Sequence, residues 1–392
     1  MKIVLITQDF YPLTGGIASY LMQIYNKYFS KEDFEVIIPE FIDPHYKTDS
    51  LPFKVHRTNF TPFDLKNSRR DIANLNILNI LKEIKPDVIL FGYLRSHPEV
   101  GLLYKKINSS SKFGIFIHAK EAFIDSTIVD VNSKDGRYQK GYTLDEAKFY
   151  KDILMSADFV FSVSNFSKQL LQSQGINRKI DVVHPSIDLN NIRLNLNAKS
   201  ELSLKNKFVL LSVGRLIRRK NHRQIILLMP ELLKVFNDFH YIIVGDGPEF
   251  DSLNKLISDL KLENNVSVWR NVSEENISLF YSACDLFLFP SIFLPPNDVE
   301  GFGIVLLEAE AYGKPVIGFD YGGVSESIVD QVTGYLISNS SEDLKNKILA
   351  LFEDSSLREK LGATGRLRVL KEFSSKESDY LINKITEDNS RS

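Results

Sequence analysis

The sequence predicts an α/β fold made of two doubly wound domains with a cleft between them. Short apolar runs alternate with longer helical patterns along most of the chain. Most of these runs are continuously apolar, which is typical of parallel strands that helices cover on both faces. The alternation stops at a polar stretch and then restarts. Because 392 residues are also many for one core, two domains are expected.

The first domain, residues 1–190, is predicted to contain short apolar strands. They are Lys2–Thr7, Glu35–Ile38, Asp87–Phe91, Lys112–Ile117, Asp158–Val163 and Asp181–Val183. The helical patterns between them are Ile17–Phe29, Ser68–Ile84, Leu144–Ser156 and Asn165–Gln174. Since strands that alternate with helices form βαβ units, a parallel sheet is expected.

Residues 191–206 are rich in Asn, Lys and Ser and are interpreted as a linker. The second domain, residues 207–372, has expected strands at Phe208–Val213, Tyr241–Val244, Val266–Trp269, Leu286–Phe289 and Pro315–Gly318. Its expected helices are Arg223–Val235, Glu249–Leu262, Glu274–Ala283, Ile304–Tyr312 and Glu342–Glu353. We allow for a last helix, 373–392, that packs back on the first domain. Ligands of such sheets bind beyond the carboxyl ends of the strands.

Composition and charge exclude several classes of protein. The net charge of −2 argues against a general nucleic-acid binder. The single cysteine, Cys284, rules out a disulfide framework and fits a reducing compartment. The apolar start, Met1–Thr7, is short and lacks a cleavage site, and no apolar run is long enough to span a bilayer. We therefore expect a cytoplasmic protein.

Two carboxylates flank a glycine-containing turn at the start of an apolar helix. Glu300 falls in the loop and Glu308 about two turns inside the helix, which puts them ~10 Å apart. The unpaired amides near Gly301 and Gly303 lie between them and favour anions. A sugar nucleotide has the matching order of sugar hydroxyls, diphosphate and ribose hydroxyls, so this segment can hold one. A helix with one capping acid and one solvated acid is the alternative.

Cationic residues follow the carboxyl end of the predicted strand Phe208–Val213. Gly214 and Arg215 come directly after it, and Lys220 lies a few residues later. A guanidinium can form two hydrogen bonds to phosphate oxygens, and a lysine adds a point charge. Two permanent cations suit a departing nucleoside diphosphate, whose charge grows as the bond breaks. The alternative is a solvated basic turn, which fits Arg218 and Arg219 better than Arg215.

Three further positions fall at the ends of predicted strands. Gly15 and Gly16 precede the first helix, where glycines let a backbone approach a ligand and expose helix amides. His118 follows a central strand and faces the expected cleft, where imidazole can bind a hydroxyl or carry a proton. A tight turn and a structural histidine are the alternatives. Gly322 and Gly323 fit phosphate contact and simple capping equally well.

No metal site is predicted. The chain has no Asp-x-Asp motif, and its seven histidines are scattered rather than clustered with cysteine. The neutralisation of a diphosphate would then fall to cations and backbone amides.

Together these residues resemble the retaining family 4 glycosyltransferases of the GT-B fold, over nearly the whole chain. The likeness is strongest in Val-Gly-Arg, Val-Gly-Asp-Gly-Pro, Glu-Gly-Phe-Gly-x-x-x-x-Glu-Ala and Gly-Gly, between Val209 and Gly334. The run Asp298–Gly301 is most similar to mannosyltransferases that act on phosphatidylinositol mannosides and to related bacterial polysaccharide enzymes. The resemblance implies a metal-independent hexosyltransferase without a cofactor. Its donor would be a GDP- or UDP-linked sugar of the mannose or glucose type.

The resemblance also implies the roles of individual residues. The catalytic residues would be His118, Glu300, Arg215 and Lys220. The donor-binding residues would be Gly15, Gly16, Gly214, Arg270, Gly301, Phe302, Gly303, Ile304 and Glu308. The two cations would hold the diphosphate, Glu300 the donor sugar and Glu308 the ribose, while His118 would lie near the reacting carbon. Arg270 stands where the family usually has glycine beside the nucleobase, which leaves the base undecided.

The acceptor is expected to be a glycan or a lipid-linked molecule. Phe60–Phe63 precedes Lys66, Arg69 and Arg70 at the start of a helix, and such a mixture can lie on an anionic membrane. Peripheral attachment at the inner face of the membrane and an ordinary surface helix are the two alternatives. Two other functions stay open. They are another GT-B enzyme, such as a phosphorylase or a sugar-nucleotide epimerase, and a non-catalytic sugar-nucleotide-binding protein.

Overall fold

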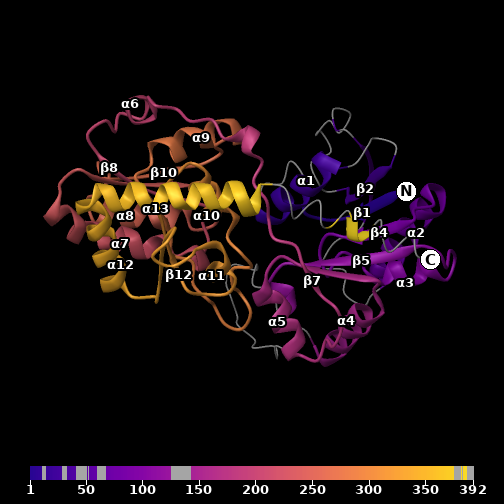
Figure 1. The fold of residues 1–392 in the computed structure, drawn as a ribbon. Helices are drawn as coiled ribbons and strands as arrows, with labels where there is room; N and C mark the ends of the chain where they lie inside the picture. The colour runs from indigo at the N-terminus through magenta and orange to yellow at the C-terminus, as the bar shows by residue number, and fades with distance from the viewer. Residues whose placement is uncertain are drawn as a thin grey trace. The chain divides into compact units, whose positions relative to one another are not determined.

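The computed structural model describes residues 1–10, 15–28, 33–40, 51, 53–59, 68–124, 143–374, 381 and 383–385. This part of the chain forms two compact units, each with a parallel sheet and helices (Figure 1). The N-terminal unit holds Met1–Pro185, Pro295–Asn297 and Lys376–Ser392, and the C-terminal unit holds Ser186–Leu294 and Asp298–Ser375. The predicted α/β class with two Rossmann-like domains is confirmed.

In the N-terminal unit, the described strands pair in the order β3-β2-β1-β4-β5-β6-β7, all in parallel. Their bounds are β1 Ile3–Ile6, β2 Phe34–Pro39, β3 Lys54–Thr58, β4 Val88–Phe91, β5 Lys112–Ile117, β6 Phe159–Ser162 and β7 Asp181–Val182. The helices are α1 Gly16–Tyr28, α2 Ser68–Ile84, α3 Glu99–Lys105, α4 Leu144–Ser156 and α5 Asn165–Ser173, with a 3-10 turn η2 at Lys120–Ala122. The sequence patterns missed β3 and α3.

In the C-terminal unit, the strand order is β10-β9-β8-β11-β12-β13, again parallel throughout. The strands are β8 Phe208–Val213, β9 Phe239–Val244, β10 Val266–Trp269, β11 Leu286–Phe289, β12 Val316–Phe319 and β13 Gly334–Ile337. The longer helices are α7 His222–Val235, α8 Phe250–Asp259, α9 Glu274–Ala283, α10 Ile304–Ala311, α12 Ser341–Glu353 and α13 Ser355–Arg368. Shorter helical pieces are η3 Leu189–Asn191, α6 Ala198–Glu201, η4 Arg218–Lys220, α11 Val324–Ser327 and η5 Val369–Phe373.

The core of each unit lies on both faces of its sheet, which explains the continuous apolar runs. Successive side chains of a strand point to opposite faces. In β1, Val4 belongs to one buried cluster and Leu5 to another. In β8, Leu210 packs with α7 on one face, while Leu211 packs with α9 and α10 on the other. Most positions of such a strand are therefore apolar.

Two segments near the predicted domain boundaries contribute side chains to the hydrophobic cores. Within 191–206, interpreted above as a linker, Leu204 is buried in the core of the C-terminal unit, and Ile192 and Leu202 pack against it. Toward the chain end, Leu381 and Ile385 are buried in the core of the N-terminal unit.

The strand order of each sheet reverses at one point. In the N-terminal unit the reversal lies between β1 and β4, and in the C-terminal unit it lies between β8 and β11. Loops that leave neighbouring strands in opposite directions open a crevice beyond the carboxyl ends, where ligands bind. The segments after β8 and β11 are therefore the places to look for a site in the C-terminal unit.

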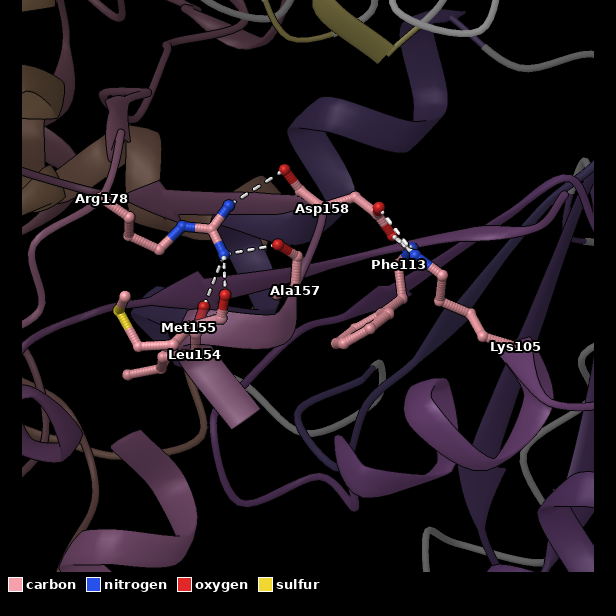
Figure 2. A network of polar contacts seen from close by, with 7 residues as sticks. All are labelled: Lys105, Phe113, Leu154, Met155, Ala157, Asp158 and Arg178. Carbon is pink, nitrogen blue, oxygen red and sulfur yellow. Dashed lines mark hydrogen bonds and ion pairs between the residues drawn. The ribbon is translucent and has the colours of Figure 1, made fainter. Parts of the chain in front are cut away.

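Arg178 fixes the other end of the sheet in the N-terminal unit, where β5 and β6 begin (Figure 2). Its guanidinium donates to carbonyl oxygens at the carboxyl end of α4, those of Leu154, Met155, Ala157 and Asp158. The Asp158 carboxylate accepts from Lys105 and, at 2.8 Å, from the main-chain N–H of Phe113. These bonds satisfy carbonyls that a helix end leaves unpaired and bring the ends of α3 and α4 to the sheet.

The structure corrects the expectation for Arg70 in α2. Arg70 is only 5% exposed, and its guanidinium forms hydrogen bonds of 2.6 and 2.7 Å to the Glu99 carboxylate. Its charge is neutralised inside the unit, so Arg70 does not offer a cation to a membrane. Phe60–Phe63 and Lys66 lie outside the described residues. Among the residues described, no helix is long and apolar enough to cross a membrane.

Glu310 is a buried acid on α10, which lies beside α13 in Figure 1. It is fully buried, and neither carboxylate oxygen has a hydrogen-bond partner among the described residues. The guanidinium of Arg368 is 3.8 Å away. Burial raises the pKa of Glu310 to about 7.

We expect Glu310→Gln to stabilise the protein in a pH-dependent way. The folded chain holds the Glu310 proton up to about pH 7, whereas an unfolded chain releases it near the ordinary value of 4.5. Since the folded state binds more protons in this window, its stability falls as pH rises through it and then levels off. The gain from the amide should therefore be small near pH 5 and reach up to about 3 kcal/mol near pH 8.

Denaturant unfolding of both proteins at the two pH values measures this difference. Glu359→Gln, an exposed acid on α13, is the matched control and should change little at either pH. A Glu310→Gln effect of equal size at both pH values would contradict the buried protonated acid.

Candidate active site

The candidate site is formed by the loops that follow β8 and β11. The turn after β8 contains η4, and the loop after β11 leads into α10. The two strands are neighbours in the sheet, and they bracket the reversal of strand order. The site thus occurs where the topology of the C-terminal unit predicts a ligand crevice.

Glu300 binds two cations through one oxygen. Its Oε2 lies 2.5 Å from Nη1 of Arg219 and 2.6 Å from Nζ of Lys220. Ser291 lies beside this ion pair, and its Oγ accepts a hydrogen bond from Nη1 of Arg219 at 2.9 Å. Burial by itself would raise the pKa of Glu300, but the charges of Arg219 and Lys220 outweigh burial and hold it far below its usual range. Glu300 is therefore a carboxylate at any pH where the protein works.

Lys220 is held between Glu300 and an aromatic face. Its ammonium lies 4.3 Å from the centre of the Phe289 ring, a cation–π contact. Gly214 lies beside the lysine stem, so that a Cβ there would be 3.5 Å from Cε. Burial, together with the like charge of Arg219, lowers the pKa of Lys220 to about 8 against the opposing effect of Glu300. Lys220 is charged at neutral pH and loses its proton in the mildly alkaline range.

The structure reverses the expected placement of two arginines in the basic turn. Arg219, interpreted above as solvated, is 6% exposed and contacts both Glu300 and Asp298. Arg215 is exposed, and its guanidinium has no hydrogen bond or ion pair within the described ranges. The acids Asp298 and Glu300 could have indicated the role of Arg219 from the sequence, because two largely buried carboxylates need more than one cation to balance their charge.

Two glycines that follow β12 support the main chain at Glu300. The N–H of Gly323 donates to the Glu300 carbonyl at 3.0 Å. A Cβ at Gly323 would fall 1.9 Å from the carbonyl oxygen of Gly301, and a Cβ at Gly322 would fall 2.3 Å from that of Glu300. The Gly-Gly pair is therefore required for backbone-to-backbone packing, a reason that neither of the two sequence-based interpretations contained.

The start of α10 presents its backbone rather than its side chains. Gly303 precedes the helix at φ +94°, a left-handed conformation that favours glycine. The Phe302 side chain is 3% exposed and packs against Phe373 in a buried cluster, and Ile304 packs on the same cluster. The buried Phe302 can therefore face a ligand only through main-chain atoms, while Ile304 is partly exposed.

Glu308 and Arg270, two further predicted donor residues, have protein partners. Glu308 is half-buried, and the hydroxyl of Tyr281 donates to its Oε2 at 2.5 Å. The exposed Arg270 forms two hydrogen bonds of 3.0 Å to Asp246 and lies over the Phe250 ring at 4.5 Å. Arg270 is thus held in place at the carboxyl end of β10.

His118 lies at the carboxyl end of β5 in the N-terminal unit, as expected. It is 8% exposed, and its Nε2 donates to the Gly92 carbonyl at 2.9 Å. Because a carbonyl only accepts, Nε2 carries the proton of the neutral ring and Nδ1 is the acceptor. Nδ1 has no hydrogen-bond partner in the described part of the chain. The ring lies between Tyr20 and Tyr93, with ring centres 5.7 and 6.5 Å away.

Gly15 and Gly16 lie at the amino end of α1, after β1. A Cβ built at either position meets no atom within 4 Å among the described residues. Their small size is therefore not required by internal packing. The structure thus groups Glu300 and Lys220 with Gly214, Gly301 and Gly303 in one unit, and places His118, Gly15 and Gly16 in the other. No metal-binding group of three or more His, Cys, Asp or Glu was found in the part of the chain described.

Both units match glycosyltransferase families. A model of glycosyltransferase family 4 matches residues 14–191, and a model of glycosyl transferases group 1 matches residues 195–368. The fold and the paired loops thus define a GT-B glycosyltransferase. This chain belongs to the family 4 glycosyltransferases, which confirms the resemblance seen in the sequence.

Curated relatives cover the chain at modest identity. One is a GDP-mannose-dependent alpha-(1-6)-phosphatidylinositol monomannoside mannosyltransferase of Mycolicibacterium smegmatis, 24% identical over 92% of each chain. A GDP-mannose-dependent monoacylated alpha-(1-6)-phosphatidylinositol monomannoside mannosyltransferase of Corynebacterium glutamicum is 33% identical over 41% of this chain and 42% of its own.

Solved structures share the fold over the whole chain. A sucrose-phosphate synthase from Thermosynechococcus elongatus has a TM-score of 0.80 at 18% identity and covers 99% of both chains. Anabaena HepE, in complex with UDP and glucose, has a TM-score of 0.77 at 21% identity, over 99% of this chain and 100% of its own. At these identities the likeness is one of fold.

Gly323→Ala should destabilise the protein and displace the Glu300 loop. The added Cβ meets a backbone oxygen that has no flexible side chain to move, so a loss of about 2 kcal/mol or more is expected. Gly16→Ala is the control for stability, because its Cβ enters open space. Thermal unfolding of both variants measures the difference, and equal melting temperatures would contradict the close packing at Gly323.

Proposed function

We propose that this glycosyltransferase moves a hexose of the mannose or glucose type from a nucleoside diphosphate sugar, with retention of configuration, to a glycan or lipid-linked acceptor. One observation carries the proposal: a buried carboxylate and a buried lysine meet at the β8/β11 reversal. The mannosyltransferase relative is named for GDP-mannose, and HepE was solved with UDP and glucose. Both bases are therefore candidates for the donor.

The geometry of Glu300 supports its proposed role on the donor sugar. Both cations bind Oε2, so Oε1 has no hydrogen-bond partner among the described residues. A carboxylate oxygen with unused lone pairs accepts strongly from a hydroxyl. We assign Oε1 to a hydroxyl of the transferred sugar, which the ion pairs on Oε2 would keep in a fixed orientation.

The cations and amides are assigned to the diphosphate. Arg215 has an unpaired, exposed guanidinium, and Lys220 is charged at neutral pH. Both can stabilise the charge that builds on the leaving phosphate, so the proposal requires no metal. The amides of Gly301, Phe302, Gly303 and Ile304 at the start of α10 would add to this effect.

The remaining residues would place the rest of the donor and the acceptor. Glu308, oriented by Tyr281, would accept from the ribose, and Arg270 would lie beside the nucleobase. Gly15 and Gly16 would let the substrate approach the start of α1, since no side chain of the described residues fills that space. Nδ1 of His118 would accept from a hydroxyl near the reacting carbon. We propose same-face attack assisted by the departing phosphate, with no covalent nucleophile.

Nucleotide release tests the function. With a panel of GDP- and UDP-linked hexoses, the protein should release GDP or UDP faster when a lipid-linked or glycan acceptor is present. A phosphorylase would depend on inorganic phosphate, an epimerase would change the sugar without releasing nucleotide, and a non-catalytic binder would bind without turnover. Any of these three results would replace the proposal.

Glu300→Gln should reduce transfer by about a hundredfold or more, because it removes the charged acceptor on the sugar. Glutamine is preferred to alanine because it keeps an oxygen acceptor for the cations, whereas alanine would leave buried Lys220 without a counter-charge and cost about 3–5 kcal/mol. Lys220→Met should weaken donor binding as well as turnover. Glu359→Gln serves as the surface control. Full transfer by Glu300→Gln, with folding verified by circular dichroism, would refute the assignment.

The acceptor proposal includes contact with an anionic membrane through α2, at the cytoplasmic face. Arg69 is exposed on this helix, and Ile72 and Leu75 are 57% and 58% exposed. Apolar side chains next to a cation are suited to the surface of an anionic bilayer.

The double variant Ile72→Asn/Leu75→Asn should bind anionic vesicles more weakly than the wild type, because it loses apolar surface that enters the lipid. Leu196→Asn is the control, since Leu196 is 98% exposed in the C-terminal unit. Vesicle sedimentation with phosphatidylglycerol and with phosphatidylcholine measures binding. Equal, negligible binding of the wild type to both lipids would count against membrane contact.

A further inference from the structure

We propose that Arg219 is a positioning residue that shares with Lys220 the charges of Glu300 and Asp298, so that Lys220 stays available to the donor diphosphate. This inference rests on the proposed function for the identity of the ligand. It goes beyond that function because Arg219 has no role among the residues that the family resemblance supplies.

Arg219 contacts three residues of the site from a buried position. Nη1 donates to Glu300 at 2.5 Å and to Ser291 at 2.9 Å, and Nε lies 3.2 Å from Asp298. Its carbonyl accepts from the N–H of Ile292 at 2.9 Å. Both the side chain and the backbone of Arg219 therefore join the turn after β8 to the loop after β11.

The charge balance shows why a second cation is needed. Glu300 and Asp298 bring two negative charges into the same buried region. Were Lys220 the only buried cation, it would serve as the counter-ion to Glu300 and would no longer attract a donor diphosphate. Arg219 and Lys220 together balance the two carboxylates, so with Arg219 present less of the Lys220 charge is needed to offset Glu300, and the lysine can also attract a diphosphate.

The neighbouring arginine shows that the turn itself does not require this placement. Arg218, in the same 3-10 turn, is exposed and its side chain has no hydrogen bond or ion pair to the described residues, whereas Arg219 is buried. A surface cation in this turn is thus compatible with the fold. What distinguishes Arg219 is the pair of acids that it meets.

A pH titration separates this role from a purely structural one. Four charged or titratable groups act on Lys220. They are Glu300 in the loop after β11, Arg219 and Arg215 in the same turn as Lys220, and His222 at the start of α7. Burial lowers its pKa to about 8, and Arg219 is one of the like charges that lower it. Removal of Arg219 therefore raises the pKa of Lys220, because Glu300 then acts on the lysine alone.

Calorimetric titration of the full chain with GDP and with UDP, between about pH 6 and pH 10, measures the effect. Wild-type affinity should fall above about pH 8, as Lys220 loses its proton. In Arg219→Met the affinity near pH 7 should fall by about tenfold or more, and the alkaline loss should move to higher pH. Arg219→Lys keeps the charge, so its alkaline loss should stay near the wild-type pH.

Arg218→Met is the matched control and should behave as the wild type. The inference is overturned if folded Arg219→Met keeps the affinity and the pH dependence of Arg218→Met. It is also overturned if Arg219→Lys loses as much affinity as Arg219→Met with no shift in pH dependence, which would indicate shape alone. Should Arg219→Met fail to fold, the Arg219→Lys titration decides. Failure of the wild type to bind either nucleotide would refute the proposed function instead.

Discussion

The contact of Glu300 Oε2 with Arg219 and Lys220 determines how the C-terminal unit can be built. The carboxylate is buried, and a buried charge without a partner costs several kcal/mol. The loops after β8 and β11 must therefore both be in place before either is stable. Gly322 and Gly323 complete the arrangement, because only residues without a Cβ let the next loop pack on the main chain of Glu300. The ligand crevice and the stability of its walls thus depend on the same few groups.

Environment, rather than residue type, decides the chemistry of the acids in this unit. Glu300 lies among cations, and its pKa is far below the ordinary value. Glu310, ten positions later, is fully buried near the Arg368 guanidinium, and burial raises its pKa to about 7. One carboxyl group is permanently charged and suited to binding hydroxyls, while the other gains its charge only as pH rises through about 7 and belongs to the packing of α10. The two acids show why a carboxylate motif needs a structure before roles are assigned.

Strands with continuous apolar runs could be predicted from the sequence, whereas the edge strand β3 could not. β4 and β11 are continuously apolar because helices cover both of their sides, and this pattern is local. β3, at an edge of its sheet, reads Lys-Val-His-Arg-Thr and has no such pattern. Only its pairing with β2 makes it a strand. Arg70 is a similar case, since its position on α2 gave no sign that Glu99 would neutralise it.

By itself, the sequence determined the α/β class, the places of the glycine turns, and the positions of Lys220 after a strand and of Glu300 in the loop before a helix. These features follow from short-range patterns of apolar runs, glycines and charges. Only the tertiary structure decided that Arg219 faces Glu300 while Arg215 faces solvent. The two residues of that ion pair are 81 positions apart, and the direction of a side chain in a 3-10 turn depends on the charge that a distant loop brings to it. No local pattern contains that information.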